Sequence, residues 1–193
     1  MNTLVLEKDY TAQEYLERGE RADRKHEFHR GKIVPVSGVS FIHNTIAVNI
    51  LTALKIAIRT KRSNHYVTNS DTKIWIDAAE RFVYPDAVLV LKRPIYYKGR
   101  TDIITNPLLV VEILSPGTQK KDRTAKFDDY RTLPTLQEYV LVDQDQPQVS
   151  VFNRSANWQE TVVQGGTHSL QLASADITLA LADIYEGIDE LRR

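Results

Sequence analysis

The feature that most constrains this sequence is the run Leu108 to Leu114 (LLVVEIL), which is apolar on both faces except at Glu112. A strand of this kind belongs at the centre of a sheet that is covered on both sides. The run ends at Ser115-Pro116-Gly117, and a second apolar strand, Leu136 to Asp143, follows a helical stretch. We expect these strands to lie parallel, joined by a crossover helix, in an α/β fold with a mixed central sheet flanked by helices.

Apolar periodicity and turn residues predict the other elements. Apolar residues recur at helical spacing from Phe41 to about Arg62, and Thr11 with Glu14 forms a capping-box pattern for a helix that stops at Gly19. A further helix starts at Thr118, with Ala125, Phe127 and Tyr130 facing inward. The expected strands are 25–29 and 32–36, joined by a turn at Arg30-Gly31, then 65–68, 72–76, 87–91, 148–153 and 158–163, and the segment 177–185 is expected to pack on the sheet edge.

Length and composition predict one domain over residues 1–193. A chain of this length with 42% apolar residues can bury one sizeable core. It contains no cysteine, which fits a reducing compartment. The start, MNTLVLEKDY, lacks the features of a signal peptide, and we expect no window to approach the roughly 20 apolar residues of a membrane span. We therefore expect a cytoplasmic protein without a membrane partner.

The charge balance gives no sign of general attraction to polyanions. The 25 basic and 25 acidic side chains cancel, which argues mildly against a nucleic-acid partner. Basic residues nevertheless gather at 55–62 and at 120–126. Each cluster is either a phosphate-binding surface or an ordinary solvated face.

Two carboxylates stand out because of where they lie. Asp86 follows Pro85 and opens an apolar strand, and Glu112 lies inside the strand predicted to be most buried. A buried carboxylate without a partner costs several kcal/mol. Two buried carboxylates that converge on one point are explained by a bound hard cation such as Mg²⁺ or Mn²⁺, since these ions prefer oxygen ligands. If each acid is considered alone, another explanation is open. Asp86 could instead cap a turn, and Glu112 could instead form a structural ion pair with an arginine.

Several motifs, in order, resemble one family. They are Tyr84-Pro85-Asp86, Val111 to Pro116, Asp122 with Lys126 and Tyr130, and Glu138 to Asp143, preceded by Glu27, Gly31, Ser37 and His43-Asn44. Together they resemble the Uma-type restriction endonuclease family, long known only as a domain of unknown function, in the PD-(D/E)XK nuclease superfamily. The resemblance spans about residues 23–143.

The resemblance implies a restriction-endonuclease-like core and a set of site residues. Asp86 and Glu112 correspond to the metal-binding acids, and the backbone carbonyl of Ile113 to a further ligand. Glu27 corresponds to an additional acid that often completes the site. Many similar nucleases act as dimers, so a homodimer is implied as well.

One position departs from the superfamily pattern. Leu114 stands where a lysine is expected two residues after the second acid. That lysine lowers the pKa of the attacking water and offsets charge on the scissile phosphate, and leucine can do neither. We assign this role to Lys126 on the following helix, with a solvated lysine as the alternative. His43 is a possible proton shuttle or phosphate contact, or else a structural histidine at a helix start.

The resulting hypothesis is a Mg²⁺-dependent endonuclease that hydrolyses phosphodiester bonds, with DNA as the expected substrate. Asp86, Glu112, Lys126 and Glu27 form the expected catalytic set. The alternative is a catalytically inactive module that binds nucleic acid or protein on the same scaffold. Among other residues, Asp122 is expected on a helix surface, and Tyr96-Tyr97-Lys98 is expected to stack bases or to form a dimer contact.

Overall fold

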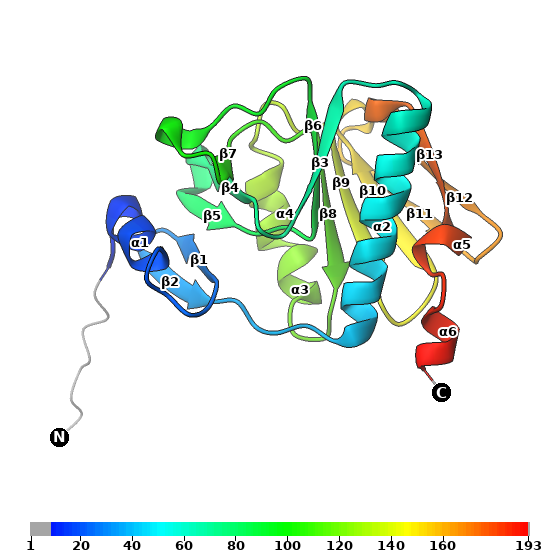
Figure 1. The fold of residues 1–193 in the computed structure, drawn as a ribbon, viewed down its shortest axis with the longest axis horizontal. Coiled ribbons are helices and arrows are strands. Elements are labelled where there is room, and N and C mark those ends of the chain that lie inside the picture. Colours follow the sequence, from blue (N-terminus) through cyan, green and yellow to red (C-terminus); the bar gives the residue numbers. More distant parts are fainter. Residues whose placement is uncertain (1–8, 193) are drawn as a thin grey trace.

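The computed structural model describes residues 9–192, so residues 1–8, on which the signal-peptide prediction depends, lie outside the described part. A six-stranded mixed sheet with the order β11-β10-β9-β8-β6-β3 forms the centre of the fold (Figure 1). Its strands are β3 (His65–Asn69), β6 (Ala87–Leu91), β8 (Leu109–Leu114), β9 (Glu138–Asp143), β10 (Gln148–Asn153) and β11 (Glu160–Gln164). The predicted mixed α/β class is confirmed.

The central position predicted for the LLVVEIL run is confirmed by β8. This strand lies between β6 and β9, and all six of its residues are buried. It pairs antiparallel with β6 and parallel with β9. The parallel pairing requires a crossover, which runs through α3 (Gln119–Asp122) and α4 (Ala125–Tyr130).

The crossover is two short helices rather than the one predicted. The backbone of Thr124 (φ −128°, ψ −101°) leaves the helical region and separates α3 from α4. This break turns Ala125 out to solvent, against the prediction. Tyr130 is buried as predicted, and Phe127 packs against the core with part of its surface exposed. The break therefore sets which side chains of the crossover point into the protein.

One face of the central sheet is covered by the long helix α2 (Phe41–Thr60), which begins at its N-cap Ser40 (Figure 1). Its side chains Ile46, Ile50, Leu54 and Ile58 belong to one core cluster with β8, β9 and β10. By length and composition alone α2 is long and apolar enough to cross a membrane, which the sequence reading missed. In the structure its inner stripe packs on the sheet.

The C-terminal segment lies on the same face as α2, not on the sheet edge as predicted. It consists of β12 (Ser169–Leu172), β13 (Ile177–Ala180), α5 (Leu181–Ile184) and α6 (Ile188–Leu191). Alternate residues of the β12–β13 hairpin are buried in the α2 core cluster. The hairpin therefore completes the cover that α2 alone leaves open.

The other face carries α3, α4 and a smaller sheet with the order β2-β1-β5-β4-β7 (Figure 1). Its strands are β1 (His26–His29), β2 (Lys32–Pro35), β4 (Lys73–Ile76), β5 (Arg81–Val83) and β7 (Ile103–Ile104), with α1 (Ala12–Gly19) beside them. Strands β5 and β7 were not predicted from the sequence, because they are only three and two residues long and such short segments show no periodicity. Short 3-10 turns lie at Asp77–Ala79, Tyr97–Gly99, Arg154–Ala156 and Ala173–Ala175.

The predicted hairpin turn is confirmed and positions the first site residue. Arg30 (φ 46°) and Gly31 (φ 84°) both adopt positive φ, as a tight two-residue hairpin turn requires. Strand β1 then pairs with β2 on one side and with β5 on the other. Glu27 is held in this way on a paired strand near Arg81 of β5.

Two isoleucines on α2 provide a test of the packing. Ile46 is fully buried, whereas Ile56 is 57% exposed. We expect Ile46→Ala to lower the free energy of unfolding by about 2 to 5 kcal/mol, since it leaves a cavity. The matched variant Ile56→Ala should change it by less than about 0.5 kcal/mol. Urea unfolding measures both, and equal losses would contradict the orientation of α2.

Candidate active site

The pairing of β6 with β8 brings Asp86 and Glu112 together. Ala87 lies opposite Val111 in antiparallel register, so Asp86, one residue before, lies opposite Glu112. The backbone N–H of Ile113 donates to Asp86 Oδ2 at 2.7 Å. Glu112 shares its face of β8 with Val110 and Leu114, the face that carries α3 and α4. Asp86 stands just before β6, and its carboxylate lies at the end of this strand next to β8. The two acids singled out in the sequence are thus neighbours in the fold.

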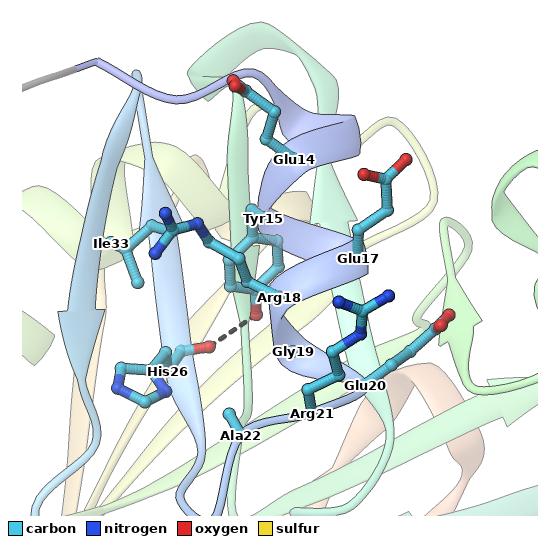
Figure 2. Close-up of a pocket in the computed structure, with 10 residues that line it drawn as sticks. All are labelled: Glu14, Tyr15, Glu17, Arg18, Gly19, Glu20, Arg21, Ala22, His26 and Ile33. Atoms are coloured by element: carbon cyan, nitrogen blue, oxygen red, sulfur yellow. Dashed lines mark hydrogen bonds between the residues drawn. The ribbon is translucent and has the colours of Figure 1, made fainter.

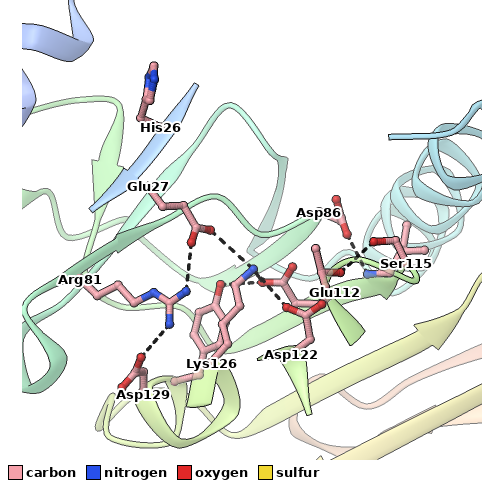
Figure 3. A network of polar contacts seen from close by, with 12 residues as sticks. His26, Glu27, Arg81, Asp86, Glu112, Ser115, Asp122, Lys126 and Asp129 are labelled. Carbon is pink, nitrogen blue, oxygen red and sulfur yellow. Dashed lines mark hydrogen bonds and ion pairs between the residues drawn. The ribbon is translucent and has the colours of Figure 1, made fainter. Parts of the chain in front are cut away.

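Lys126 reaches this pair from α4 (Figure 3). Its Nζ lies 2.8 Å from Glu112 Oε1, 3.6 Å from Asp122 Oδ1 and 3.7 Å from Glu27 Oε1. The side chain is buried, so the alternative of a solvated lysine does not describe it. Leu114 points to the same face, where its side chain lies in the apolar core. An ammonium group therefore lies beside Glu112, although it comes from Lys126 on α4 and not from position 114.

Glu112 has a second donor in Tyr130. The Tyr130 hydroxyl donates to Glu112 Oε1 at 2.8 Å. Glu112 itself is only 4% exposed, so this bond and the Lys126 contact supply polar partners that water would otherwise provide. The sequence marks Tyr130 as an inward-facing residue but gives no sign of its polar role.

Glu27 belongs to a second part of the network, centred on Arg81. Arg81 donates to Glu27 Oε2 at 3.0 Å and to Asp129 Oδ2 at 2.8 Å (Figure 3). Burial would raise the pKa of Glu27, but the positive charges of Lys126 and Arg81 lower it below its usual value. Glu27 is therefore held as a charged carboxylate between two cations. The sequence analysis missed Arg81, since β5 itself was not predicted.

Asp122 is part of the site, against the prediction of a surface charge. It is only 3% exposed, and its carboxylate faces Lys126, four residues later, across the break at Thr124. Tyr139 donates to its backbone carbonyl at 3.0 Å. Asp122 and Lys126 lie on separate short helices, so their contact depends on how α3 and α4 pack and not on a shared helix face.

His43 contacts Asp86 from the first turn of α2. Its Nε2 lies 3.4 Å from Asp86 Oδ2, and its backbone N–H donates to the Ser40 cap. Its Nδ1 is buried and has no hydrogen-bond partner among the described residues. His43 therefore adjoins the acidic pair as well as the helix start.

Other sequence candidates lie elsewhere. Tyr97 is buried against Trp75 and Phe82, so its ring is closed to base stacking. A cavity of about 610 Å³ lies between α1 and the β1–β2 hairpin, where the Tyr15 hydroxyl donates to the carbonyl of His26 (Figure 2). Since His26 and Glu27 are successive strand residues, this cavity lies across β1 from the charged network.

Burial gives the network unusual protonation. It raises the pKa of Glu112 to about 8, with Lys126 opposing the rise and Asp122 and Asp86 adding to it. Burial alone would lower the pKa of Lys126, but the carboxylates of Glu112, Glu27 and Asp122 raise it above its usual value. A proton on Glu112 thus offsets a local excess of negative charge.

The charge balance and the ligand chemistry fit a divalent cation. Four carboxylates line the site: those of Glu27, Glu112 and Asp122 face Lys126, and that of Asp86 faces His43. The one arginine, Arg81, is shared between Glu27 and Asp129. Carboxylate oxygens are the ligands that Mg²⁺ and Mn²⁺ prefer. Within residues 9–192, however, no three His, Asp or Glu side chains already surround one point as a metal would need. The Lys126 ammonium stands where three of the four carboxylates converge.

The raised pKa of Glu112 predicts a pH dependence of stability. The folded protein keeps a proton on Glu112 up to about pH 8, whereas the unfolded chain releases it near its ordinary value of 4.5. This contribution to stability is fully present below pH 4.5 and is lost as the pH rises to about 8.

Urea unfolding in a chelating buffer measures this effect. From pH 5 to pH 8 the free energy of unfolding of the wild type should fall relative to Glu112→Gln, by up to about 3.5 kcal/mol. The matched variant Asp128→Asn, at an exposed acid of α4, should follow the wild type. A difference between wild type and Glu112→Gln that stays constant with pH would contradict the raised pKa.

Comparisons with known proteins identify relatives of this chain. The Uma2 family model, described as "Putative restriction endonuclease", matches residues 12–182. The chain is 38% identical to the uncharacterized protein sll1609 of Synechocystis sp. over 144 residues, 75% of this chain and 80% of that one. It is 33% identical to the uncharacterized protein slr1290 of the same organism, over 91% of each chain.

A solved structure shares the fold. The crystal structure of "a putative nuclease belonging to DUF820" from Anabaena variabilis superposes with a TM-score of 0.73 at 17% identity, covering 93% of this chain and 99% of that one. The predicted restriction-endonuclease-like fold and the predicted family are both confirmed. The chain belongs to the Uma2 family.

Proposed function

We propose that this protein is a metal-dependent endonuclease that hydrolyses phosphodiester bonds, with DNA as its substrate. The observation that carries the proposal is that Asp86, just before β6, lies beside Glu112 of β8, with the Lys126 ammonium 2.8 Å from Glu112. Two acids and a lysine at one buried point are the side chains that such hydrolysis requires. Family membership supports the same reading.

Each residue has a distinct part in this proposal. Asp86 and Glu112 would hold Mg²⁺ or Mn²⁺, with the backbone carbonyl of Ile113 as a further ligand. The bound ion would polarise the scissile phosphate and acidify the attacking water. Lys126 offsets the negative charge that develops on the phosphate and favours the deprotonated form of the water. Atoms of the substrate would enter where Lys126 now faces three carboxylates.

Tyr130 and His43 keep the two acids in place. The Tyr130 hydroxyl fixes Glu112 through a hydrogen bond, and its burial holds its own pKa well above the usual value, so it stays a donor. Asp86 Oδ2 accepts from Ile113 N–H and faces His43. This leaves the other oxygen of Asp86 for the cation. Fixed carboxylates need little reorganisation when they bind an ion.

Phosphate contacts would come from the basic residues next to the site. Lys120 and Lys121 are exposed on α3, beside the buried Asp122. The other basic cluster, at residues 55–62, includes Lys55 and Arg59 and lies on α2, which covers the opposite face of the sheet. It is therefore the weaker candidate for phosphate contacts. A homodimer and a cytoplasmic location stay predictions from the sequence.

The test pairs metal binding with cleavage. We expect calorimetric titration to show saturable Mn²⁺ binding to the wild type, and cleavage of plasmid or single-stranded DNA when Mg²⁺ or Mn²⁺ is added. Asp86→Asn and Glu112→Gln should each weaken metal binding at least about 10-fold and reduce cleavage at least about 100-fold. Asp128→Asn on α4 serves as the matched control and should behave as the wild type.

The outcomes separate the two functional readings. Undiminished cleavage by Glu112→Gln would show that the activity does not depend on this site. Metal binding that depends on Asp86 but is never followed by cleavage would identify a catalytically inactive binding module. Absence of saturable Mn²⁺ binding would contradict the metal site itself.

A further inference from the structure

One ammonium lies among three carboxylates that come from three separate elements. Glu112 is on β8, Asp122 on α3 and Glu27 on β1, and Lys126 Nζ is within 3.7 Å of an oxygen of each. At 2.8 Å its distance from Glu112 is that of a charge-assisted hydrogen bond, whereas the other two are longer contacts. A shift of about 1 Å away from Glu112 is enough to give it hydrogen bonds to Glu27 and Asp122 instead.

Glu27 is poorly suited to a divalent cation. One of its oxygens accepts from Arg81, and the other faces Lys126. A divalent ion on Glu27 would lie close to two fixed positive charges in a buried site, where charge repulsion is strong. Arg81 itself is held by Asp129, so it does not move aside without breaking that pair.

Asp86 has the opposite surroundings. Its described polar neighbours are the backbone N–H of Ile113 and the imidazole of His43, with no lysine or arginine among its ion pairs in residues 9–192. Glu112, across the strand pair, has Lys126 as its cationic neighbour. The four acids therefore differ in the fixed cations beside them: Glu27 has Lys126 and Arg81, Glu112 and Asp122 each have Lys126, and Asp86 has neither among residues 9–192.

We propose that Glu27 is a positioning residue for Lys126 and not a metal ligand: the ammonium moves from Glu112 toward Glu27 and Asp122 when Glu112 turns to a divalent cation. This inference rests on the proposed metal site. It differs from the role that the family resemblance implies for Glu27, which is that of an additional metal acid.

The arrangement makes the lysine and the metal competitors for Glu112. Without metal, Lys126 partly neutralises Glu112. With metal, Glu27 and Asp122 keep the same ammonium close to the reacting phosphate. Removing either acid should therefore leave the ammonium on Glu112 and weaken metal binding, but only if Lys126 is present.

A double-mutant cycle tests this dependence, with Mn²⁺ affinity measured by calorimetry on the full chain. We expect Glu27→Gln and Asp122→Asn each to weaken Mn²⁺ binding about five-fold in the wild-type background. Lys126→Met should tighten it by a similar factor. In the Lys126→Met background, Glu27→Gln and Asp122→Asn should each change Mn²⁺ affinity by less than about two-fold.

The opposite pattern would overturn the inference. If Glu27→Gln weakens Mn²⁺ binding equally with and without Lys126, Glu27 is a metal ligand and not an anchor for the lysine. If Lys126→Met binds Mn²⁺ more weakly than the wild type, there is no competition. Asp128→Asn is the control for loss of a nearby carboxylate and should leave the affinity unchanged in both backgrounds.

A second measurement guards against misfolding. The Mn²⁺-induced rise in the thermal unfolding midpoint should rank the variants in the same order as calorimetry. Should Lys126→Met fail to fold, Lys126→Gln replaces it in the same cycle. A failure of the proposed metal site itself gives a different result: Asp86→Asn would then leave Mn²⁺ affinity unchanged, whatever residue stands at position 126.

Discussion

The buried ion pair between Glu112 and Lys126 is the interaction on which the rest of this site depends. A carboxylate in the middle strand of a six-stranded sheet loses most of its hydration, and only an oriented positive charge or a proton compensates for that loss. Here the ammonium of Lys126, the hydroxyl of Tyr130 and a raised pKa all act on the one carboxyl group. Because Asp86 and Asp122 add negative charge at the same place, the compensation is incomplete, which is why we propose that the site takes a cation.

The topology explains how these groups meet. Antiparallel pairing of β6 with β8 sets Asp86 opposite Glu112, and parallel pairing of β8 with β9 requires a crossover that passes over the same face. The crossover carries Lys126 and Tyr130, and the smaller sheet adds Glu27 and Arg81 from β1 and β5. Groups that are far apart in the chain thus converge at one point on one face. The opposite face, filled by α2 and the β12–β13 hairpin, supplies the apolar core that holds the sheet in place.

Much of the fold was predictable because its main elements carry strong local signals. The two-sided apolar run of β8, the stripe of α2, the capping box at Thr11 and the Arg30-Gly31 turn all occur as predicted. The failures have local causes too. Strand β5 is three residues long, the backbone of Thr124 interrupts a helix in a segment with continuous helical periodicity, and the C-terminal hairpin covers a face that the sequence alone could not show to be open.

The sequence by itself determined that Asp86 and Glu112 are exceptional, since a charge within an apolar strand is visible in the order of residues, and the motifs together pointed to the family. It also showed that position 114 holds no lysine. Only the tertiary structure decided which lysine reaches Glu112, that Asp122 is buried, and that Arg81 binds Glu27. The physical reason is that hydrophobic periodicity depends on neighbours three or four residues away. The ion pairs of this site, by contrast, join side chains up to 99 positions apart, as in the contact of Glu27 with Lys126, once the sheets bring them together.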